Sequence, residues 1–283
     1  MEIKNVMVVG AGQMGAGIAQ VCAQAGYQVL LHDIKEAAVE KGLAVIQKNL
    51  TRQVEKERMT EDDKNMILAN VIKSTTITDA ENADIIIEAV VEKVEVKTAI
   101  FTELDRYAPA HAILASNTSS LPITEIAAAT KRPDRVIGMH FMNPVPVMKL
   151  VEIIRGLATT EEVFSVIEMM TKKLKKVPVA VNDFPGFISN RVLMPMINEA
   201  VYALYEGVAS KEAIDEVMKL GMNHPMGPLT LADFIGLDTC LFIMETLHDG
   251  FGDDKYRPCP LLRKYVKAGW LGKKTGRGFY TYE

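Results

Sequence analysis

The sequence has few of the features that mark disulfide-bonded, metal-binding or membrane proteins. Its 283 residues include three cysteines, Cys22, Cys240 and Cys259, which lie far apart in no spacing typical of metal ligands. No run approaches the roughly 20 consecutive apolar residues of a membrane span. Strand-like sequence begins almost at Met1, where a signal peptide would have charged and apolar regions. We therefore expect free, buried thiols, a cytoplasmic location and no membrane partner.

The sequence also lacks an excess of charge of either sign. Lysine and arginine total 32 against 36 aspartate and glutamate residues, and the net charge is −4. A basic field of the kind that attracts nucleic acid is absent, so we expect no nucleic-acid partner. The hydrophobic content of 48% and the charged content of 24% are typical of a folded globular protein. A chain of this length forms one large domain or two ordinary ones.

A glycine-rich turn stands between two apolar runs near the start of the chain. Residues 6–9 are typical of a buried parallel strand, a helical pattern covers 16–25, and a second strand at 28–31 leads to Asp33. This order of strand, glycine-rich turn, helix, strand and acid is the full context of a dinucleotide-binding unit. We expect its turn residues to bind the cofactor: Gly10, Gly12, Gln13, Met14 and Gly15.

Each glycine of the turn has its own physical purpose. Gly10 permits the tight turn, Gly12 lets the backbone approach a pyrophosphate, and Gly15 lets the helix pack closely on the strand. The first N–H groups of the helix also present a partial positive charge to the phosphates. Asp33 is placed to bind the ribose hydroxyls and to repel a 2′-phosphate, which favours NAD, while nearby Lys35 softens that preference and leaves NADP possible.

The alternation of strand and helix patterns predicts an α/β fold followed by helices alone. We expect a Rossmann-type, doubly wound, mostly parallel sheet over residues 1–183 and a smaller all-α domain over 184–283. The long charged stretch at 36–70, in which Thr60 can cap a second helix, predicts an inserted helical pair. Further strands are expected at 71–72, 83–90, 112–115, 136–141, 150–154 and 177–181, and later helices at 187–206, 210–221, 229–247 and 261–268.

Polar residues follow two of the predicted strands, where a doubly wound sheet faces its cofactor. Glu92 is expected on the nicotinamide side, and Lys97 can pair with it or form an ordinary surface ion pair. Residues 116–120, Ser-Asn-Thr-Ser-Ser, either cap the next helix or donate hydroxyl hydrogen bonds to a substrate. In the inserted helix, Lys48, Arg52 and Lys56 share one face, which is either a solvated cationic stripe or a surface for a polyphosphate.

The segment from residue 136 to residue 153 carries the best candidate for proton transfer. Two apolar runs flank a turn with two prolines, and antiparallel pairing about Pro146 would place His140 opposite Glu152. A carboxylate that holds one imidazole nitrogen leaves the other for proton transfer. Ser119 and Asn190 can hold the reacting oxygen. These side chains predict an oxidoreductase in which the cofactor carries the hydride and the protein manages one proton.

Five segments together make the chain resemble the short-chain L-3-hydroxyacyl-CoA dehydrogenase family over its full length. The pattern is similar to that of the bacterial members that serve butyrate and butanol fermentation. The resemblance implies NAD as the cofactor and acetoacetyl-CoA and (S)-3-hydroxybutyryl-CoA as the substrates. The segments are 10–15, 116–120, 140–146 with Glu152, 183–191 and 272–276.

The resemblance also implies roles for individual residues. His140 is the acid/base, Glu152 orients it, and Ser119 and Asn190 contact the substrate oxygen. A CoA-binding lysine of the family falls on Lys56, which favours the phosphate-binding interpretation of its helix face. Asn49, however, stands where animal relatives have a CoA-contacting serine. The NAD contacts of the family fall on Asp33, Glu92, Lys97, Ser119, Asn143 and Lys274.

Two other functions compete with this one. Another β-hydroxyacid dehydrogenase would act on a substrate without CoA, but the relatives considered use a catalytic lysine in the helix where this chain has Asn190. A non-enzymatic, nucleotide-binding structural protein is the second, and the presence of His140, Glu152 and Ser119 argues against it. The helical domain is expected to contribute to the substrate cleft and to form a homodimer or a dimer-based oligomer.

Overall fold

The computed structural model describes residues 2–283, and the chain divides into two compact units, residues 1–183 and 184–283. We call these the N-terminal unit and the C-terminal unit. The N-terminal unit is built on a sheet whose strands are β1 (Asn5–Val9), β2 (Gln28–His32), β3 (Val71–Ser74), β4 (Ile85–Glu88), β5 (Ile113–Ser116), β6 (Val136–Phe141), β7 (Leu150–Arg155) and β8 (Val177–Asn182).

The order of these strands is that of a doubly wound sheet. It runs β3–β2–β1–β4–β5–β6–β7–β8, and the pairs are parallel except that β7 runs antiparallel to β6. The chain leaves β1 and returns to the other side of it at β4, so the topology reverses beside β1. This confirms the predicted Rossmann-type, mostly parallel sheet and places a ligand crevice at the carboxyl ends of these strands.

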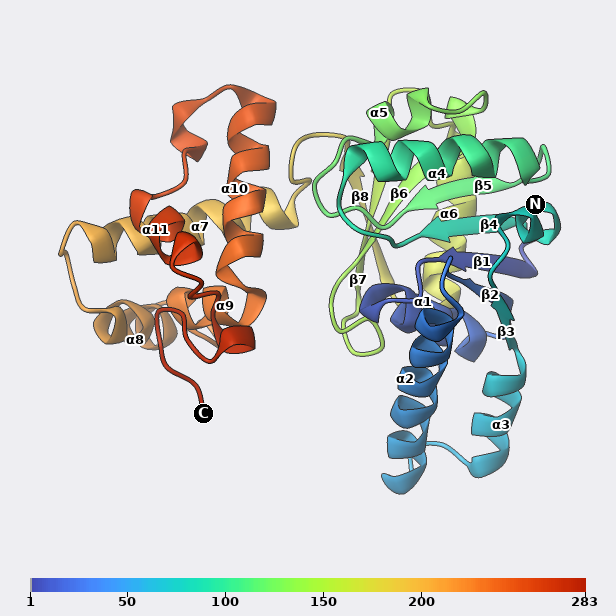
Figure 1. The fold of residues 1–283 in the computed structure, drawn as a ribbon, viewed down its shortest axis with the longest axis horizontal. Coiled ribbons are helices and arrows are strands. Elements are labelled where there is room, and N and C mark those ends of the chain that lie inside the picture. The colour runs from blue at the N-terminus through green and yellow to red at the C-terminus, as the bar shows by residue number, and fades with distance from the viewer. Residues whose placement is uncertain (1) are drawn as a thin grey trace. The chain divides into compact units, whose positions relative to one another are not determined.

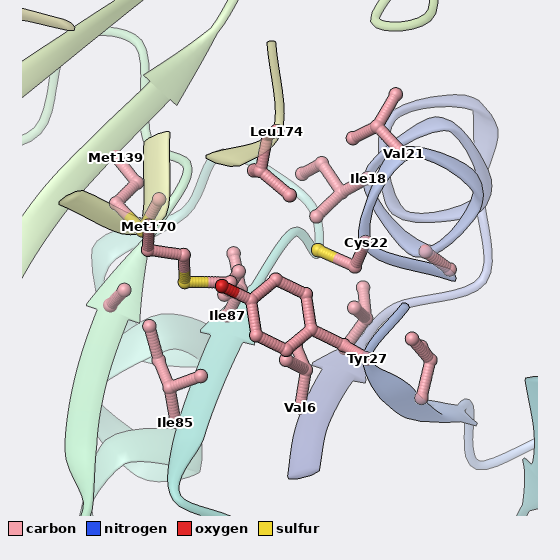
Figure 2. Close-up of a cluster of buried hydrophobic side chains, with 14 of the residues drawn as sticks. Val6, Ile18, Val21, Cys22, Tyr27, Ile85, Ile87, Met139, Met170 and Leu174 are labelled. Carbon is pink, nitrogen blue, oxygen red and sulfur yellow. The ribbon is translucent and has the colours of Figure 1, made fainter. Parts of the chain in front are cut away.

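Helices cover both faces of the sheet (Figure 1). Alternate strand residues point to opposite faces, and Val6, Ile85 and Ile87 pack with Ile18 and Cys22 of the first helix on one of them (Figure 2). On the other face, a Cβ at Gly138 of β6 would lie 2.9 Å from Ile123. The helices are α1 (Gln13–Gln24), α2 (Glu36–Glu55), α3 (Glu61–Ala69), α4 (Val94–Tyr107), α5 (Ile123–Ala128) and α6 (Glu161–Lys173), with short 3-10 turns η1 (Ile77–Asn82) and η2 (Pro133–Arg135).

The inserted helical pair forms as predicted. α2 and α3 pack against each other between β2 and β3, and Thr60 separates them. The Thr60 hydroxyl accepts a hydrogen bond from the Asp63 N–H, and the Asp63 carboxylate accepts one from the Thr60 N–H. This capping box satisfies two helix N–H groups that would otherwise have no partner within the helix.

The C-terminal unit is all helical. Its core includes the buried residues Met194, Val201, Leu229 and Leu247, and the Ser210 hydroxyl accepts a hydrogen bond from the Ala213 N–H, as expected of a helix cap. The helices are α7 (Ser189–Tyr205), α8 (Lys211–Gly221), α9 (Pro228–Ile235), α10 (Leu237–Phe251) and α11 (Pro260–Lys267), with 3-10 turns η3 (Asp254–Tyr256) and η4 (Lys273–Thr275).

The prediction of one helix over residues 229–247 is wrong, because Gly236 separates α9 from α10. Gly236 has φ 102°, a conformation that favours glycine. The N–H of Leu237 then donates to the Leu271 carbonyl instead of continuing the helix. The apolar pattern runs through this break, and the single glycine was its only sequence signal. In the part of the chain that the structure describes, no helix has the length and apolar character needed to cross a bilayer.

Candidate active site

The glycine-rich turn connects β1 to the N-terminus of α1. A Cβ at Gly15 would lie 1.7 Å from the Gly10 carbonyl oxygen, so the close approach of helix and strand requires glycine. Apart from Gly12 itself and the residues next to it in the chain, no atom lies within 4 Å of the position that a Cβ at Gly12 would occupy. The Ala11 N–H donates to Asp33 Oδ2 at 3.0 Å, which ties the end of β2 to the turn. Asp33 therefore stands beside the turn, as the sequence predicted.

A cavity of about 710 Å³ opens at this turn. Gly10, Gly12 and Asp33 line it, and Val90 and Ile100 are among the apolar side chains of its wall. An apolar wall suits an adenine ring, a carboxylate at the end of β2 suits a ribose, and the open space over Gly12 at a helix N-terminus suits a pyrophosphate. These features fit a dinucleotide such as NAD.

The pair of residues on β6 and β7 has the geometry that the sequence predicted. His140 lies opposite Glu152 in the antiparallel register, and His140 Nδ1 is 2.8 Å from Glu152 Oε2. Both residues are buried: 7% of His140 and 2% of Glu152 is exposed. Because an ionised carboxylate only accepts hydrogen bonds, Nδ1 carries the proton and the lone pair of the neutral ring is on Nε2. The ring is thereby set up to exchange a proton through Nε2.

The turn between β6 and β7 is also tied to the cofactor loop. Gln13 Nε2 donates to Asn143 Oδ1 at 3.0 Å, which links the first turn of α1 to the proline turn. A Cβ at Gly17 would lie 2.8 Å from Val145, so α1 and this turn pack closely. The predicted cofactor residue Asn143 thus lies beside Gln13 of the glycine-rich motif.

Glu92 binds the polar residues that follow β5. Its Oε1 accepts hydrogen bonds from Thr118 Oγ1 at 2.5 Å, from the N–H groups of Ser119 and Ser120 at 2.8 and 3.1 Å, and from their hydroxyls. Burial by itself would raise the pKa of Glu92, but the positive charge of Lys97 and these hydrogen bonds outweigh it and lower the pKa. Glu92 is therefore a carboxylate that holds the serine-rich loop in place.

Lys97 lies beneath that loop rather than on the surface. Only 1% of the residue is exposed, and its Nζ is 2.7 Å from Glu88 Oε1 and 3.3 Å from Glu92 Oε2. The interpretation of Lys97 and Glu92 as a surface ion pair is wrong, because Lys97 is buried and also pairs with Glu88. Glu88 was missed at the sequence level. The available signal was a glutamate at the end of an otherwise apolar strand, four residues before Glu92.

The cationic residues of the inserted helix do not form one uniform site. Lys48 and Arg52 line a shallow hollow of about 400 Å³ on α2, and Lys56 is the residue that ends the helix. Asn49 donates a hydrogen bond from Nδ2 to Gln20 Oε1 of α1 at 3.1 Å. Asn49 therefore has a partner within the protein.

The remaining predicted residues belong to the C-terminal unit. Asn190 is buried in the first turn of α7. Lys274 lies on η4, and its Nζ is 2.7 Å from Asp238 Oδ2. The absence of a side chain at Gly236 makes room for this contact, since a Cβ there would lie 3.1 Å from Lys274 Nζ. Asp238 was not predicted as a partner, because the break at Gly236 that presents it was not expected.

Comparisons with known proteins agree with this arrangement. Residues 5–184 match the 3-hydroxyacyl-CoA dehydrogenase NAD binding domain, and residues 186–282 match the C-terminal domain of that family. The chain is 66% identical to a probable 3-hydroxybutyryl-CoA dehydrogenase of Bacillus subtilis (strain 168), over 100% of the chain and 99% of the relative. It is 45% identical to human mitochondrial hydroxyacyl-coenzyme A dehydrogenase, over 99% of the chain and 92% of the relative.

A solved structure extends the agreement to three dimensions. The crystal structure of (S)-3-hydroxybutyryl-CoA dehydrogenase from Ralstonia eutropha superposes with a TM-score of 0.98 at 53% identity, and the match covers 100% of both chains. The dinucleotide cavity and the histidine–glutamate pair thus occur on a chain whose whole length follows one family. This chain belongs to the 3-hydroxyacyl-CoA dehydrogenase family, with NAD as its cofactor.

Proposed function

We propose that this protein interconverts (S)-3-hydroxybutyryl-CoA and acetoacetyl-CoA with NAD(H). The observation that carries the proposal is the buried hydrogen bond of 2.8 Å between His140 and Glu152, in the same unit as a cavity that fits a dinucleotide. Relatives at 66% and 57% identity bear the name 3-hydroxybutyryl-CoA dehydrogenase, the first of them with the word probable. That agreement favours a short acyl chain and a CoA thioester over a free acid.

In this proposal His140 is the acid/base. In the oxidation direction, His140 Nε2 accepts the proton of the 3-hydroxyl group. In the reduction direction, the protonated ring returns that proton to the oxygen of the 3-oxo group. Glu152 accepts the Nδ1 hydrogen bond throughout and stabilises the imidazolium when it forms. The chemistry that bound NAD supplies is hydride exchange at C3.

Other residues hold the reactants in place. We assign Ser119 and Asn190 to the substrate oxygen, because hydroxyl and amide donors stabilise the charge that develops there. Glu92 supports this role by accepting a hydrogen bond from the Ser119 N–H, which holds the residue in place. The Ser119 hydroxyl also donates to Glu92, and in this proposal it turns from Glu92 to the substrate oxygen when the substrate binds. Asp33, the glycine-rich turn, Asn143 and Lys274 are assigned to NAD. Lys56, with Lys48 and Arg52, is assigned to the phosphates of CoA.

An assay of NADH consumption tests the proposal. Acetoacetyl-CoA should be reduced rapidly with NADH and more slowly with NADPH, and acetoacetate without CoA should be a poor substrate. His140→Gln should abolish turnover while the melting temperature stays close to that of the wild-type protein. Preference for the free acid would point to another β-hydroxyacid dehydrogenase. Cofactor binding without turnover of any acyl-CoA would point to a structural protein.

We also propose that the protein is a homodimer joined through its C-terminal unit. α8 exposes Val217 and Leu220, and Met222 follows it, with 61, 78 and 62% of these residues accessible. Apolar side chains this exposed on one helix are typical of a contact surface. Light scattering after size-exclusion chromatography should give twice the chain mass, and Leu220→Glu should yield monomers. A wild-type monomer would contradict this proposal.

A cytoplasmic location is the last part of the proposal. Cys22, Cys240 and Cys259 are free and buried, and burial raises the pKa of the Cys22 and Cys240 thiols to about 12. Such thiols are protonated and unreactive, as is typical of proteins in a reducing compartment. Cell fractionation should recover the protein with cytoplasmic enzymes, and recovery from an extracellular fraction would contradict this location.

A further inference from the structure

Three ionisable side chains form a buried cluster below the serine-rich loop. Glu88 is fully buried, Lys97 is 1% exposed, and 24% of the Glu92 side chain is accessible. Lys97 Nζ lies between the two carboxylates, at 2.7 Å from Glu88 and 3.3 Å from Glu92. We call these three residues the carboxylate cluster. It contains two acids and one base.

Several hydrogen bonds converge on each of the two acids. Glu88 accepts from Lys97 Nζ, from the Val90 N–H and from Ser116 Oγ, each at 2.7 Å. Glu92 accepts from Lys97 and from the loop at residues 118–120. A carboxylate that accepts several hydrogen bonds is stabilised in its ionised state. Counted as two carboxylates and one ammonium group, the carboxylate cluster has a formal net charge of −1. The low dielectric around Glu88 and Lys97 screens this charge weakly.

The carboxylate cluster lies at the edge of the sheet that faces the cofactor. Glu88 and Ser116 are paired residues at the carboxyl ends of β4 and β5. Glu92 accepts hydrogen bonds from the N–H and the hydroxyl of Ser119, the residue that the proposed function assigns to the substrate oxygen beside the reactive end of the cofactor. The two forms of NAD differ in charge at their reactive end, since the oxidised nicotinamide ring is a cation and the reduced ring is neutral. A fixed negative charge at this edge acts on one form only.

We propose that the carboxylate cluster sets the relative affinity for the two forms of the cofactor and favours NAD⁺ over NADH. Glu88 is then a positioning residue. It anchors Lys97 and Ser116, and these in turn fix Glu92 and the serine-rich loop. Lys97 acts through Glu92, because both of its carboxylate contacts are inside the protein. The inference rests on the proposed nicotinamide position beside Glu92 and goes beyond it by assigning a redox preference to a buried charge.

The inference can be tested with variants that change the net charge of the carboxylate cluster in known steps. Glu88→Gln changes its net charge from −1 to 0 and keeps a side chain of the same shape. Adding Lys97→Met to that variant returns the net charge to −1, now carried by Glu92 alone. Glu95→Gln is the matched control, because Glu95 is an exposed carboxylate in the first turn of α4, the helix that carries Lys97. The ratio of the Kd for NADH to the Kd for NAD⁺ is the readout, measured by calorimetry on the full-length protein without acyl-CoA.

The expected results separate a charge effect from a structural one. Glu88→Gln should lower the ratio several-fold, mainly by weakening NAD⁺ binding. Glu88→Gln/Lys97→Met should move the ratio back toward the wild-type value, and Glu95→Gln should leave it unchanged. A ratio that is unchanged in Glu88→Gln, or equally low in the double variant, would overturn the inference. If Glu88→Gln does not fold, Glu92→Gln supplies the same change in net charge, and an unchanged ratio there would overturn it as well.

This test can fail separately from the proposed function. Binding of both cofactor forms with one ratio across the whole series would refute the redox preference and leave the dehydrogenase proposal intact. If the wild-type protein did not reduce acetoacetyl-CoA, the dehydrogenase proposal would be refuted, and the Kd ratios of the series could still follow the expected order. Wild-type protein that binds neither form of the cofactor would overturn both.

Discussion

The two units of the molecule bury their carboxylates in different ways. In the N-terminal unit, Lys97 lies between Glu88 and Glu92, and Glu152 holds the ring of His140. In the C-terminal unit, Asp233 accepts hydrogen bonds from two backbone N–H groups and a tyrosine hydroxyl. Asp215 likewise accepts from the start of α9 and from Tyr280. Each of these buried acids in the N-terminal unit has a partner that can be charged, whereas the hydrogen bonds to Asp233 and Asp215 come from neutral donors.

The difference separates acids that take part in the chemistry from acids that stabilise the fold. Asp233 and Asp215 connect the tail at residues 279–282 to the helices of the C-terminal unit, so they close the chain on itself. Burial raises the pKa of Asp233, and the nearby charge of Asp215 adds to this, although hydrogen bonds from the tail partly oppose it. Glu92 is shifted downward instead. The pKa values of Glu92 and Asp233 shift in opposite directions because Glu92 has a cation, Lys97, as a partner, and Asp233 does not.

Among substitutions of the buried acids, the largest effect is expected from Glu152→Gln. The amide oxygen of glutamine can still accept the Nδ1 hydrogen bond, so the fold should be retained, but it cannot stabilise the imidazolium. We expect kcat to fall by roughly 10²–10⁴-fold, the range attributed to general acid–base catalysis, with little change in the Kd for NAD⁺. Steady-state kinetics with acetoacetyl-CoA and a calorimetric binding measurement check this. Glu162→Gln, on an exposed residue of α6, is the control. Near-normal turnover in Glu152→Gln would remove this acid from the chemistry and weaken the contrast between the units.

A smaller effect, on stability and not on turnover, is expected from Asp233→Asn. The amide NH₂ would face a backbone N–H, so Phe279 or Tyr280 would lose its acceptor. An unsatisfied buried donor costs about 1–3 kcal/mol, and we expect the free energy of unfolding of the C-terminal unit to fall by that amount. The value of kcat should stay close to that of the wild-type protein. Tyr282→Phe, which removes one hydrogen bond, should cost only ~0.5–1.5 kcal/mol.

Urea unfolding and steady-state kinetics on the same preparations measure both quantities. A large fall in kcat without loss of stability would place Asp233 among the acids that serve the chemistry.

Opposite pKa shifts predict opposite dependences of stability on pH. The pKa of Glu92 in the folded protein lies below its usual value of 4.5, so its stabilising contribution is complete above that value and is lost as the pH falls through the folded pKa. The pKa of Asp233 lies above its usual 3.8, so its contribution is complete below 3.8 and is lost as the pH rises through the folded pKa. The stability difference between wild type and Glu92→Gln should therefore grow with pH in the acid range, while that for Asp233→Asn should shrink. Slopes of the same sign would contradict the comparison.

The sequence predicted the N-terminal unit better than the C-terminal one. The register of His140 and Glu152 followed from a proline turn between two apolar runs, because antiparallel pairing with period two leaves few alternatives. The eight-stranded sheet followed from apolar runs with glycine or polar residues at their ends. The break at Gly236 was missed, because a single glycine in a helical pattern is usually tolerated.

Buried partners were the part of the site that the sequence could not supply. Glu88 reads as a strand residue, and only the pairing of β4 with β5 shows that it meets Ser116 and Lys97. Asp183 is a similar case. Its carboxylate accepts from the N–H groups of Ile123 and Thr124 and so caps α5 from far along the chain. Contacts of this kind depend on tertiary structure and have no local pattern.

The smallest effect is expected from Asp238→Asn. Asp238 is the exception to the comparison, because it is an acid of the C-terminal unit that pairs with a cation. Lys274 and Asp238 are an ion pair in the C-terminal unit, but 47 and 40% of their side chains are accessible. Exposed pairs contribute only ~0.2–1 kcal/mol, because solvent screens them and ordering two side chains costs entropy. Stability should therefore change little. If the pair serves to position Lys274 for the cofactor, the Kd for NAD⁺ should rise a few-fold, and raising the salt concentration should weaken NAD⁺ binding less in the variant than in wild type. An unchanged Kd at low salt would mean that this pair, like Asp233, serves the fold, and the contrast between the two units would then have no exception.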